Sequence, residues 1–178
     1  SDTVLQLAER MKQFEIIPEF SFVLGTPSDE VDRQIDRDIQ YIRRIKAINP
    51  QSEIVIYVYS PVCFDDAGLL RQARRRGFTF PKRLTDWLDP AWQVFDLRKN
   101  PRTPWLEARH VDRIVNFERV LNARFPTISD IKLKSWQTAI LKTLGSWRYA
   151  FSFYAVPWEI RLVANRLFRY RQPEIEGF

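Results

Sequence analysis

The feature that most constrains this chain is a strand–helix–strand succession in its first third. The run EFSFVLG, residues 19–25, is short, rich in aromatic and β-branched residues, and bounded by Pro18 and Gly25, which predicts a strand. A helix is predicted over residues 28–47 from apolar residues three or four positions apart: Val31, Ile35, Ile39, Ile42 and Ile45. The run EIVIYVYS, residues 53–60, is continuously apolar, which is typical of a strand buried on both faces.

A strand, a helix and a strand in this order predict one βαβ unit with parallel strands and a right-handed crossover. Two strands buried on both faces need neighbours at each edge, and the rest of the chain offers AWQVFDL, residues 91–97, as a weak third strand. A further helix is predicted over residues 3–13, before the first strand. We therefore expect an α/β chain that is a piece of a larger α/β protein.

The remainder of the sequence predicts a mainly helical C-terminal region. A short helix ends at the arginine run before Gly77, and a proline- and tryptophan-rich loop follows. Longer helices are expected at 106–125, 129–153 and from Pro157 to about residue 169. The expected organisation is an α/β part over residues 1–90 and a helical extension over residues 91–178.

The net charge and the number of cysteines exclude several classes of protein. The 178 residues carry a net charge of +6 and one cysteine, Cys63, which excludes an internal disulfide framework and a zinc site built on several thiolates. The sequence has no apolar run long enough for a membrane span, and a cytoplasmic protein is expected. The arginines are dispersed over several predicted helices and interleaved with acids, so no nucleic-acid partner is expected.

The Gly25–Thr26–Pro27 turn follows the first strand and is the main candidate for a binding site. Ligands of α/β proteins bind at the carboxyl ends of parallel strands, and a glycine there lets the backbone approach a ligand closely. Asp29 and Glu30 would repel an anion at this position, and there is no Walker lysine. The alternative is that Thr26, Pro27 and Ser28 only start the following helix.

Other candidate sites are weaker. His110 is the only histidine and is expected on a helix surface rather than in a metal site, and Cys63 has no evident general base. Seven aromatic residues crowd the C-terminal region beside arginines: Trp136, Trp147, Tyr149, Phe151, Phe153, Tyr154 and Trp158. Packing in the core is favoured for them, with peripheral contact to an anionic membrane as the alternative.

The stretch FSFVLGTPSDEVDRQIDRDIQYIRRIKAINPQSEIVIYVYSPV, followed by a short helix, RRRGF, a proline and LTDW, resembles the later part of radical S-adenosylmethionine enzymes. The branch that often carries an N-terminal cobalamin-binding domain is the most similar. The likeness covers residues 3–90. It implies that the chain is a fragment of a partial (β/α) barrel, with the C-terminal part of the barrel over residues 1–90. Two features depart from the family pattern: residues 62–66 (VCFDD) replace its Pro-Gly-Thr, and its three-cysteine motif is absent.

The resemblance implies a parent oxidoreductase that uses a 4Fe-4S iron-sulfur cluster and S-adenosylmethionine, with cobalamin as an option. Three thiolates hold that cluster, so one cysteine cannot bind it, and we expect this chain to have no catalytic or metal-binding residues and to be inactive alone. Its expected partner is a missing N-terminal part of the same polypeptide. Self-association through exposed strand edges is also expected, and the alternative is that the aromatic C-terminal helices fold over these edges.

The resemblance also implies roles for residues on the two strands. Gly25, Thr26 and Pro27 would lie at the barrel rim near the nucleoside. Strand alternation places Ser21 and Val23 on the same face as Gly25, and Tyr57 and Tyr59 on one face of the next strand. These faces are expected to line the lumen, with the tyrosines on the substrate side. The alternative function is a self-contained α/β module that binds a nucleotide or a protein without catalysis.

Overall fold

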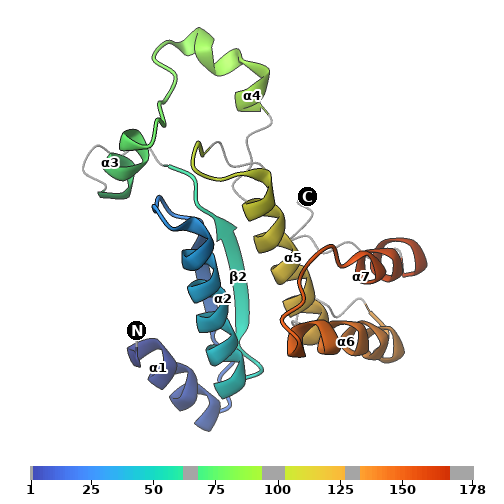
Figure 1. The fold of residues 1–178 in the computed structure, drawn as a ribbon. Helices are drawn as coiled ribbons and strands as arrows, with labels where there is room; N and C mark the ends of the chain where they lie inside the picture. The colour runs from blue at the N-terminus through green and yellow to red at the C-terminus, as the bar shows by residue number, and fades with distance from the viewer. Residues whose placement is uncertain (1, 62–67, 94–102, 127–132, 169–178) are drawn as a thin grey trace.

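A computed structural model of the chain describes residues 2–61, 68–93, 103–126 and 133–168 (Figure 1). The first part contains α1 (Asp2–Gln13), β1 (Glu19–Leu24), α2 (Val31–Ile48) and β2 (Glu53–Val58). Three short helices follow: α3 (Gly68–Arg75), the 3-10 helix η1 (Leu84–Leu88) and α4 (Pro90–Gln93). The last part contains α5 (Ala108–Arg124), α6 (Ser135–Ala150), α7 (Trp158–Leu162) and η3 (Val163–Leu167), which is a π-helical turn.

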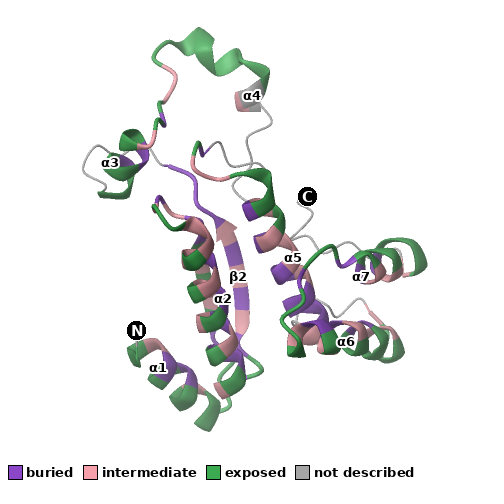
Figure 2. Ribbon diagram, viewed as in Figure 1, coloured by how far each residue is buried: buried purple, intermediate pink, exposed green. Residues whose placement is uncertain are grey.

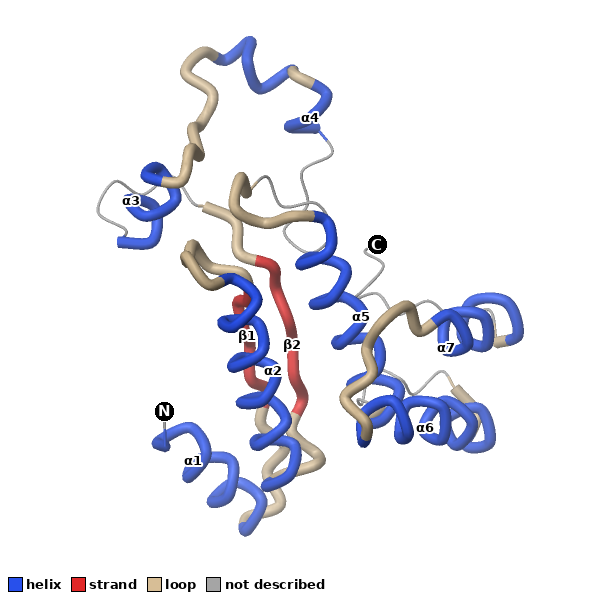
Figure 3. The backbone as a smooth tube through the Cα atoms, in the orientation of Figure 1, coloured by secondary structure: helices blue, strands red, loops and turns tan. Residues whose placement is uncertain are grey.

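The βαβ unit is confirmed. Strands β1 and β2 pair in parallel, from Glu19 opposite Glu53 to Leu24 opposite Val58, and within the described residues they form a two-stranded sheet. Helix α2 lies across both strands (Figure 3). The chain is therefore an α/β structure whose C-terminal region is mainly helical, as the sequence predicts.

One face of the sheet carries the hydrophobic core. Alternate strand residues, Leu24, Ile54, Ile56 and Val58 among them, are buried in one cluster with the apolar stripe of α2. Helices α1 and α5 add to the same cluster, from residues such as Leu5 and Phe117. Residues on both sides of position 90 thus share one core, and α2 and α5 cover the same side of the strands (Figure 1).

The other face of the sheet remains partly exposed. Burial alternates along both strands, so that Ser21 is exposed, Val23 is 50% exposed, and Val55 and Tyr57 are half-buried (Figure 2). Val23 lies opposite Tyr57 in the parallel register. The prediction that the second strand is buried on both faces is therefore wrong for the described structure, because the helices that bury it pack on one side.

The start of α2 and the predicted third strand differ from the predictions. Helix α2 begins at Val31 rather than at residue 28, because the Ser28 hydroxyl accepts the backbone N–H of Glu30 at 3.1 Å and closes a turn before the helix. The weak third strand over 91–97 is contradicted in its first part, where Pro90–Gln93 is helical, and its remaining residues lie outside the described part.

The C-terminal helices pack on α5 rather than on the sheet (Figure 1). Gly145 of α6 lies against the α5 backbone, where an added Cβ would sit 2.7 Å from the Arg124 nitrogen. The prediction that the C-terminal aromatic residues pack in the core holds for Tyr154 and is wrong for five others, which are exposed: Trp136, Trp147, Phe151, Phe153 and Trp158. No helix among the described residues is both long and apolar enough to cross a membrane.

Lys46 is a buried cation near the end of α2. Its side chain is 4% exposed, and Nζ donates hydrogen bonds to the carbonyls of Pro50, at 3.0 Å, and Ser52, at 2.5 Å. Burial lowers the pKa of Lys46 to about 8, although the nearby Glu53 carboxylate favours the charged form. The ammonium group thus holds the connection between α2 and β2 in place, and its burial carries a desolvation penalty.

This burial predicts a pH dependence of stability. Since the folded state releases the proton near pH 8 and the unfolded state near its ordinary value of 10.5, the unfolded state binds more protons between these values. The free energy of unfolding should therefore rise across this window by roughly 2 kcal/mol relative to a Lys46→Met variant. Urea unfolding at a series of pH values measures the difference, with the exposed Lys12→Met as the matched control. Parallel curves for wild type and Lys46→Met would contradict the prediction.

Candidate functional site at the carboxyl ends of the strands

The Gly25 turn lies at the carboxyl ends of the two parallel strands, where α/β proteins bind ligands. Gly25 is buried and has φ +75°, a left-handed conformation that favours glycine. The Trp105 indole Nε1 donates a hydrogen bond of 2.9 Å to the Gly25 carbonyl, and the Leu106 side chain would lie 2.9 Å from an added Cβ. The space that the absent Cβ of Gly25 leaves open is thus filled by the segment before α5.

Thr26, Pro27 and Ser28 lead into α2 and are tied to it. The Thr26 hydroxyl accepts a hydrogen bond from Gln34 Nε2, and Pro27 is buried. Together with the Ser28 turn, these contacts agree with the alternative that the residues start a helix. The same contacts hold the turn in place at the strand ends. A ligand-binding site at this turn would therefore be preformed.

A polar cavity of about 920 Å³ opens beside this turn. It is lined by Pro27, Ser28, Asp29, Gln72, Arg75, Arg76, Pro104 and Trp105. Arg76, whose side chain is mostly buried, forms an ion pair with the exposed Asp29. Asp29 therefore neutralises one of the two guanidinium groups, and Arg75 at the end of α3 supplies the second positive charge.

The predicted lumen residues divide into two groups. Ser21 and Val23 lie with Tyr57 on the partly exposed face of the sheet, and the parallel register brings Val23 opposite Tyr57. Tyr59 instead is buried beyond the strand end, with its ring 6.0 Å from the Trp105 ring and its backbone N–H bonded to the Leu24 carbonyl at 2.8 Å. Burial raises the pKa of the Tyr59 hydroxyl.

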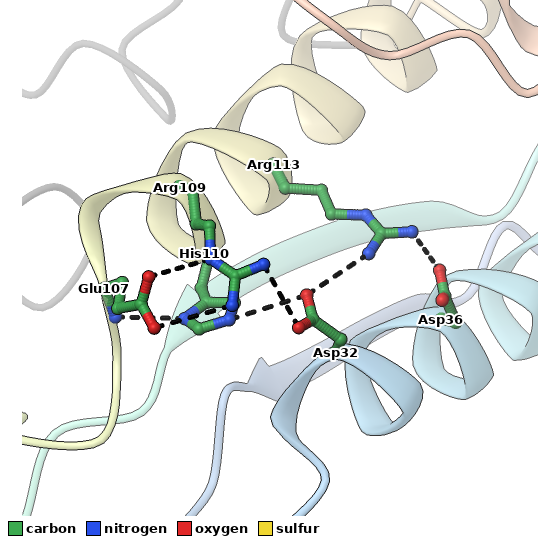
Figure 4. A network of polar contacts seen from close by, with 6 residues as sticks. All are labelled: Asp32, Asp36, Glu107, Arg109, His110 and Arg113. Carbon is green, nitrogen blue, oxygen red and sulfur yellow. Dashed lines mark hydrogen bonds and ion pairs between the residues drawn. The ribbon is translucent and has the colours of Figure 1, made fainter.

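A network of charged side chains joins α2 to α5 next to these strand ends (Figure 4). Asp36 of α2 pairs with Arg113 of α5, and Asp32 lies 3.7 Å from Arg113 Nη1 and 3.3 Å from Arg109 Nη1. Arg109 Nε also donates to Glu107 at 2.8 Å, and this contact lowers the pKa of Glu107. The acids in the first turns of α2 thus neutralise cations that would otherwise be unfavourable near the N-terminus of α5.

His110 belongs to this network and is buried, so the prediction of a surface histidine is wrong. Its Nδ1 accepts the backbone N–H of Glu107 at 3.0 Å, which places the ring proton on Nε2, 3.5 Å from Asp32 Oδ1. Since both nitrogens face protein groups, neither is directed at a substrate. We interpret the Asp32–His110 pair as a contact between helices rather than as a catalytic dyad.

The residues present do not form a metal centre in the described part of the chain. Within residues 2–61, 68–93, 103–126 and 133–168, no group of three or more His, Cys, Asp or Glu side chains is arranged to hold a metal ion. Cys63 lies outside these ranges.

Two parts of this site are not evident in the sequence. Trp105 and Leu106 close the Gly25 turn from 80 residues away, and no local pattern links them to it. The partners of Asp32 and Asp36 come from α5, although the basic residues at three- and four-residue spacing, Arg109, His110 and Arg113, are a signal that this helix faces acids.

Comparisons with known proteins found no matching family model, no matching curated protein and no matching solved structure.

Proposed function

We propose that this chain forms part of the wall of a radical S-adenosylmethionine enzyme of (β/α) barrel type. The observation that carries the proposal is the one-sided cover of the parallel strands. Helices α1, α2 and α5 bury one face of the sheet, while the face with Ser21, Val23 and Tyr57 stays open. A barrel wall has this arrangement, with helices outside and alternate strand residues directed into the lumen.

In this proposal the residues at the strand ends position the nucleoside. Leu106 covers Gly25, so a ligand would approach along Val23 and the Thr26–Pro27 turn rather than over the glycine. Tyr57 faces the lumen beside Val23, and Tyr59 supports the rim through Trp105. Their roles are binding and orientation, and we place the enzyme in the cytoplasm because its thiol chemistry needs a reducing compartment.

The iron-sulfur cluster of such an enzyme does not fit the residues of this chain. The cluster needs three thiolates, and the sequence has one cysteine. The proposal therefore requires that the cluster ligands lie in residues outside this sequence. The chain itself supplies the wall and the rim.

The proposal is tested in a polypeptide that contains this chain together with a three-cysteine motif. Formation of 5′-deoxyadenosine is measured after anaerobic reconstitution, and a Val23→Trp variant, which fills the lumen face, should lower the rate about 100-fold with unchanged iron content. Phe14→Trp, at an exposed site after α1, is the matched control and should leave the rate unchanged.

Two results would reject the proposal. One is a reading frame around this sequence that encodes no three-cysteine motif, and the other is a Val23→Trp enzyme with wild-type activity. As a further control, the 178-residue chain alone should hold no stoichiometric iron and sulfide after reconstitution, because one thiolate cannot anchor the cluster.

The polar cavity at the strand ends favours a second candidate, a self-contained nucleotide-binding module. Arg75, Gln72 and the Trp105 indole line this cavity next to the Gly25 turn, and guanidinium groups suit phosphates. Isothermal titration of the chain alone distinguishes the two functions. Binding of ATP that is lost in an Arg75→Gln variant would favour the module, and no binding favours the barrel wall.

A further inference from the structure

An exposed aromatic patch surrounds the turn between α6 and α7. Its members are Trp147, Phe151, Phe153, Val156 and Trp158, with exposed fractions from 43% for Trp147 to 80% for Phe151. Surface apolar residues are common singly, but five large ones within one turn and its flanking helix ends form a patch that marks an interaction site. We infer that this patch, with the basic residues of the α6–α7 region, docks peripherally on an anionic lipid bilayer.

The patch is held in a fixed geometry although it is exposed. The Trp147 and Phe153 rings are stacked with centroids 6.0 Å apart, and the Arg148 guanidinium lies 4.9 Å and 5.0 Å from their centroids. Val156 has φ +35°, a left-handed conformation that is strained for a β-branched residue. This residue is 63% exposed, and strained backbone conformations cluster at functional sites.

Several polar groups of the turn have partners within the protein. Arg148 Nη1 donates to the carbonyls of Phe153, at 3.3 Å, and Ala155, at 2.7 Å, and Nη2 donates to the Val156 carbonyl at 3.3 Å. Arg43 donates to the hydroxyls of Ser152 and Tyr154. Since three carbonyls and two hydroxyls have protein partners, these five groups do not oppose contact of the turn with a less polar environment.

The segment that carries the patch has an excess of exposed basic residues. In residues 133–168 the exposed charged side chains are all basic: Lys134, Lys142, Arg161 and Arg166. The one acid of this segment, Glu159, is mostly buried and is ion-paired with Arg148. Two acids, Asp36 and Asp112, line the groove between α2, α5 and the turn, and Asp36 is paired with Arg113.

The exposed basic residues indicate which kind of partner the patch binds. Tryptophan and phenylalanine beside lysine and arginine are the composition of surfaces that lie in the headgroup region of anionic membranes, with each nearby cation adding attraction. The proposed contact is peripheral, in the headgroup region of the bilayer. A protein partner of neutral, apolar character would not need the excess of exposed basic residues on the α6–α7 segment.

The test is sedimentation of the 178-residue chain with lipid vesicles. We expect binding to phosphatidylcholine vesicles with about 30 mol% phosphatidylglycerol to be about tenfold tighter than to pure phosphatidylcholine vesicles, with a blue shift of tryptophan emission. Salt at about 0.5 M should weaken this binding several-fold.

Variants separate the apolar and the electrostatic contributions. Phe151→Ser/Trp158→Ser should bind anionic vesicles about tenfold more weakly. Lys142→Gln/Arg161→Gln should lose about as much and become less sensitive to salt than wild type, because two of the four exposed cations are removed. Phe14→Ser/Leu84→Ser removes two exposed apolar residues elsewhere and should bind like wild type. All substituted residues are exposed, and circular dichroism checks that each variant keeps the fold.

Wild-type protein that fails to bind anionic vesicles, or a Phe151→Ser/Trp158→Ser variant that binds as well as wild type, would overturn the inference. Light scattering tests the remaining possibility, that a second copy of the chain binds to the patch. If the chain self-associates through the patch, the same variant abolishes the association while the vesicles bind nothing, and the patch is then an interface between copies rather than a membrane site.

Discussion

Replacing Arg148 by methionine should lower the free energy of unfolding by about 3–5 kcal/mol, because it leaves a mostly buried carboxylate and several carbonyls without their donor. Arg148 is buried, and its guanidinium donates to both oxygens of Glu159, with a distance of 2.8 Å between Nη2 and Oε2. The same group holds the carbonyls of the α6–α7 turn. Urea unfolding followed by circular dichroism measures the loss.

Two further variants make this result specific. Arg161→Met changes an exposed arginine on α7 and should stay within about 0.5 kcal/mol of wild type. Arg148→Met/Glu159→Leu removes both charges and should recover roughly 1–2 kcal/mol of the single variant's loss, because no unpaired carboxylate remains. Equal stability of Arg148→Met and Arg161→Met would show that the buried pair does not hold the turn.

Gly145→Ala should destabilise the fold by about 2 kcal/mol, and Gly145→Val by about 3 kcal/mol. In an ordinary helix interior, alanine is more favourable than glycine by about 1 kcal/mol, so the expected sign is opposite to helix propensity. The reason is the close crossing of α5 and α6, where a Cβ at this position would lie 2.7 Å from Arg124 N and 2.9 Å from the Ala123 carbonyl carbon. Backbone atoms cannot move aside as a flexible side chain does.

The matched control for this substitution is Gly68→Ala, at the start of α3. There the nearest atom to an added Cβ is Arg71 Nη2, at 3.8 Å, so the substitution should leave the free energy of unfolding within about 0.5 kcal/mol of wild type. Thermal unfolding of the two alanine variants side by side measures the contrast. A Gly145→Ala protein that melts above wild type would mean that the two helices separate without penalty.

The βαβ unit was predictable because its signals are local. The isoleucines of α2 repeat at helical spacing, and the run in β2 is short and β-rich, so each element is defined within its own residues. The parallel pairing then follows from the order of the elements. The start of α2 was harder to predict, since Ser28 has the composition of a helix cap but closes a turn before the helix.

The site was only partly predictable, because its decisive contacts are distant in sequence. The glycine conformation at Gly25 follows from its place after a strand, whereas its cover by Trp105 and Leu106 depends on how the chain returns to the strand ends. Arg148 and His110 look like surface residues by type, and both are buried because partners on other segments compensate them. Hydrophobic periodicity does not report such pairings.

Trp105 has a mechanical consequence that reaches beyond the strand ends. Its ring packs against a second, small hydrophobic cluster formed by Leu70, Ala73 and Phe78, while its indole N–H holds the Gly25 carbonyl. One side chain therefore contacts both the carboxyl end of the sheet and the segment that contains α3. A rotation that releases Gly25 also removes an aromatic wall from the small cluster, so these two regions rearrange together.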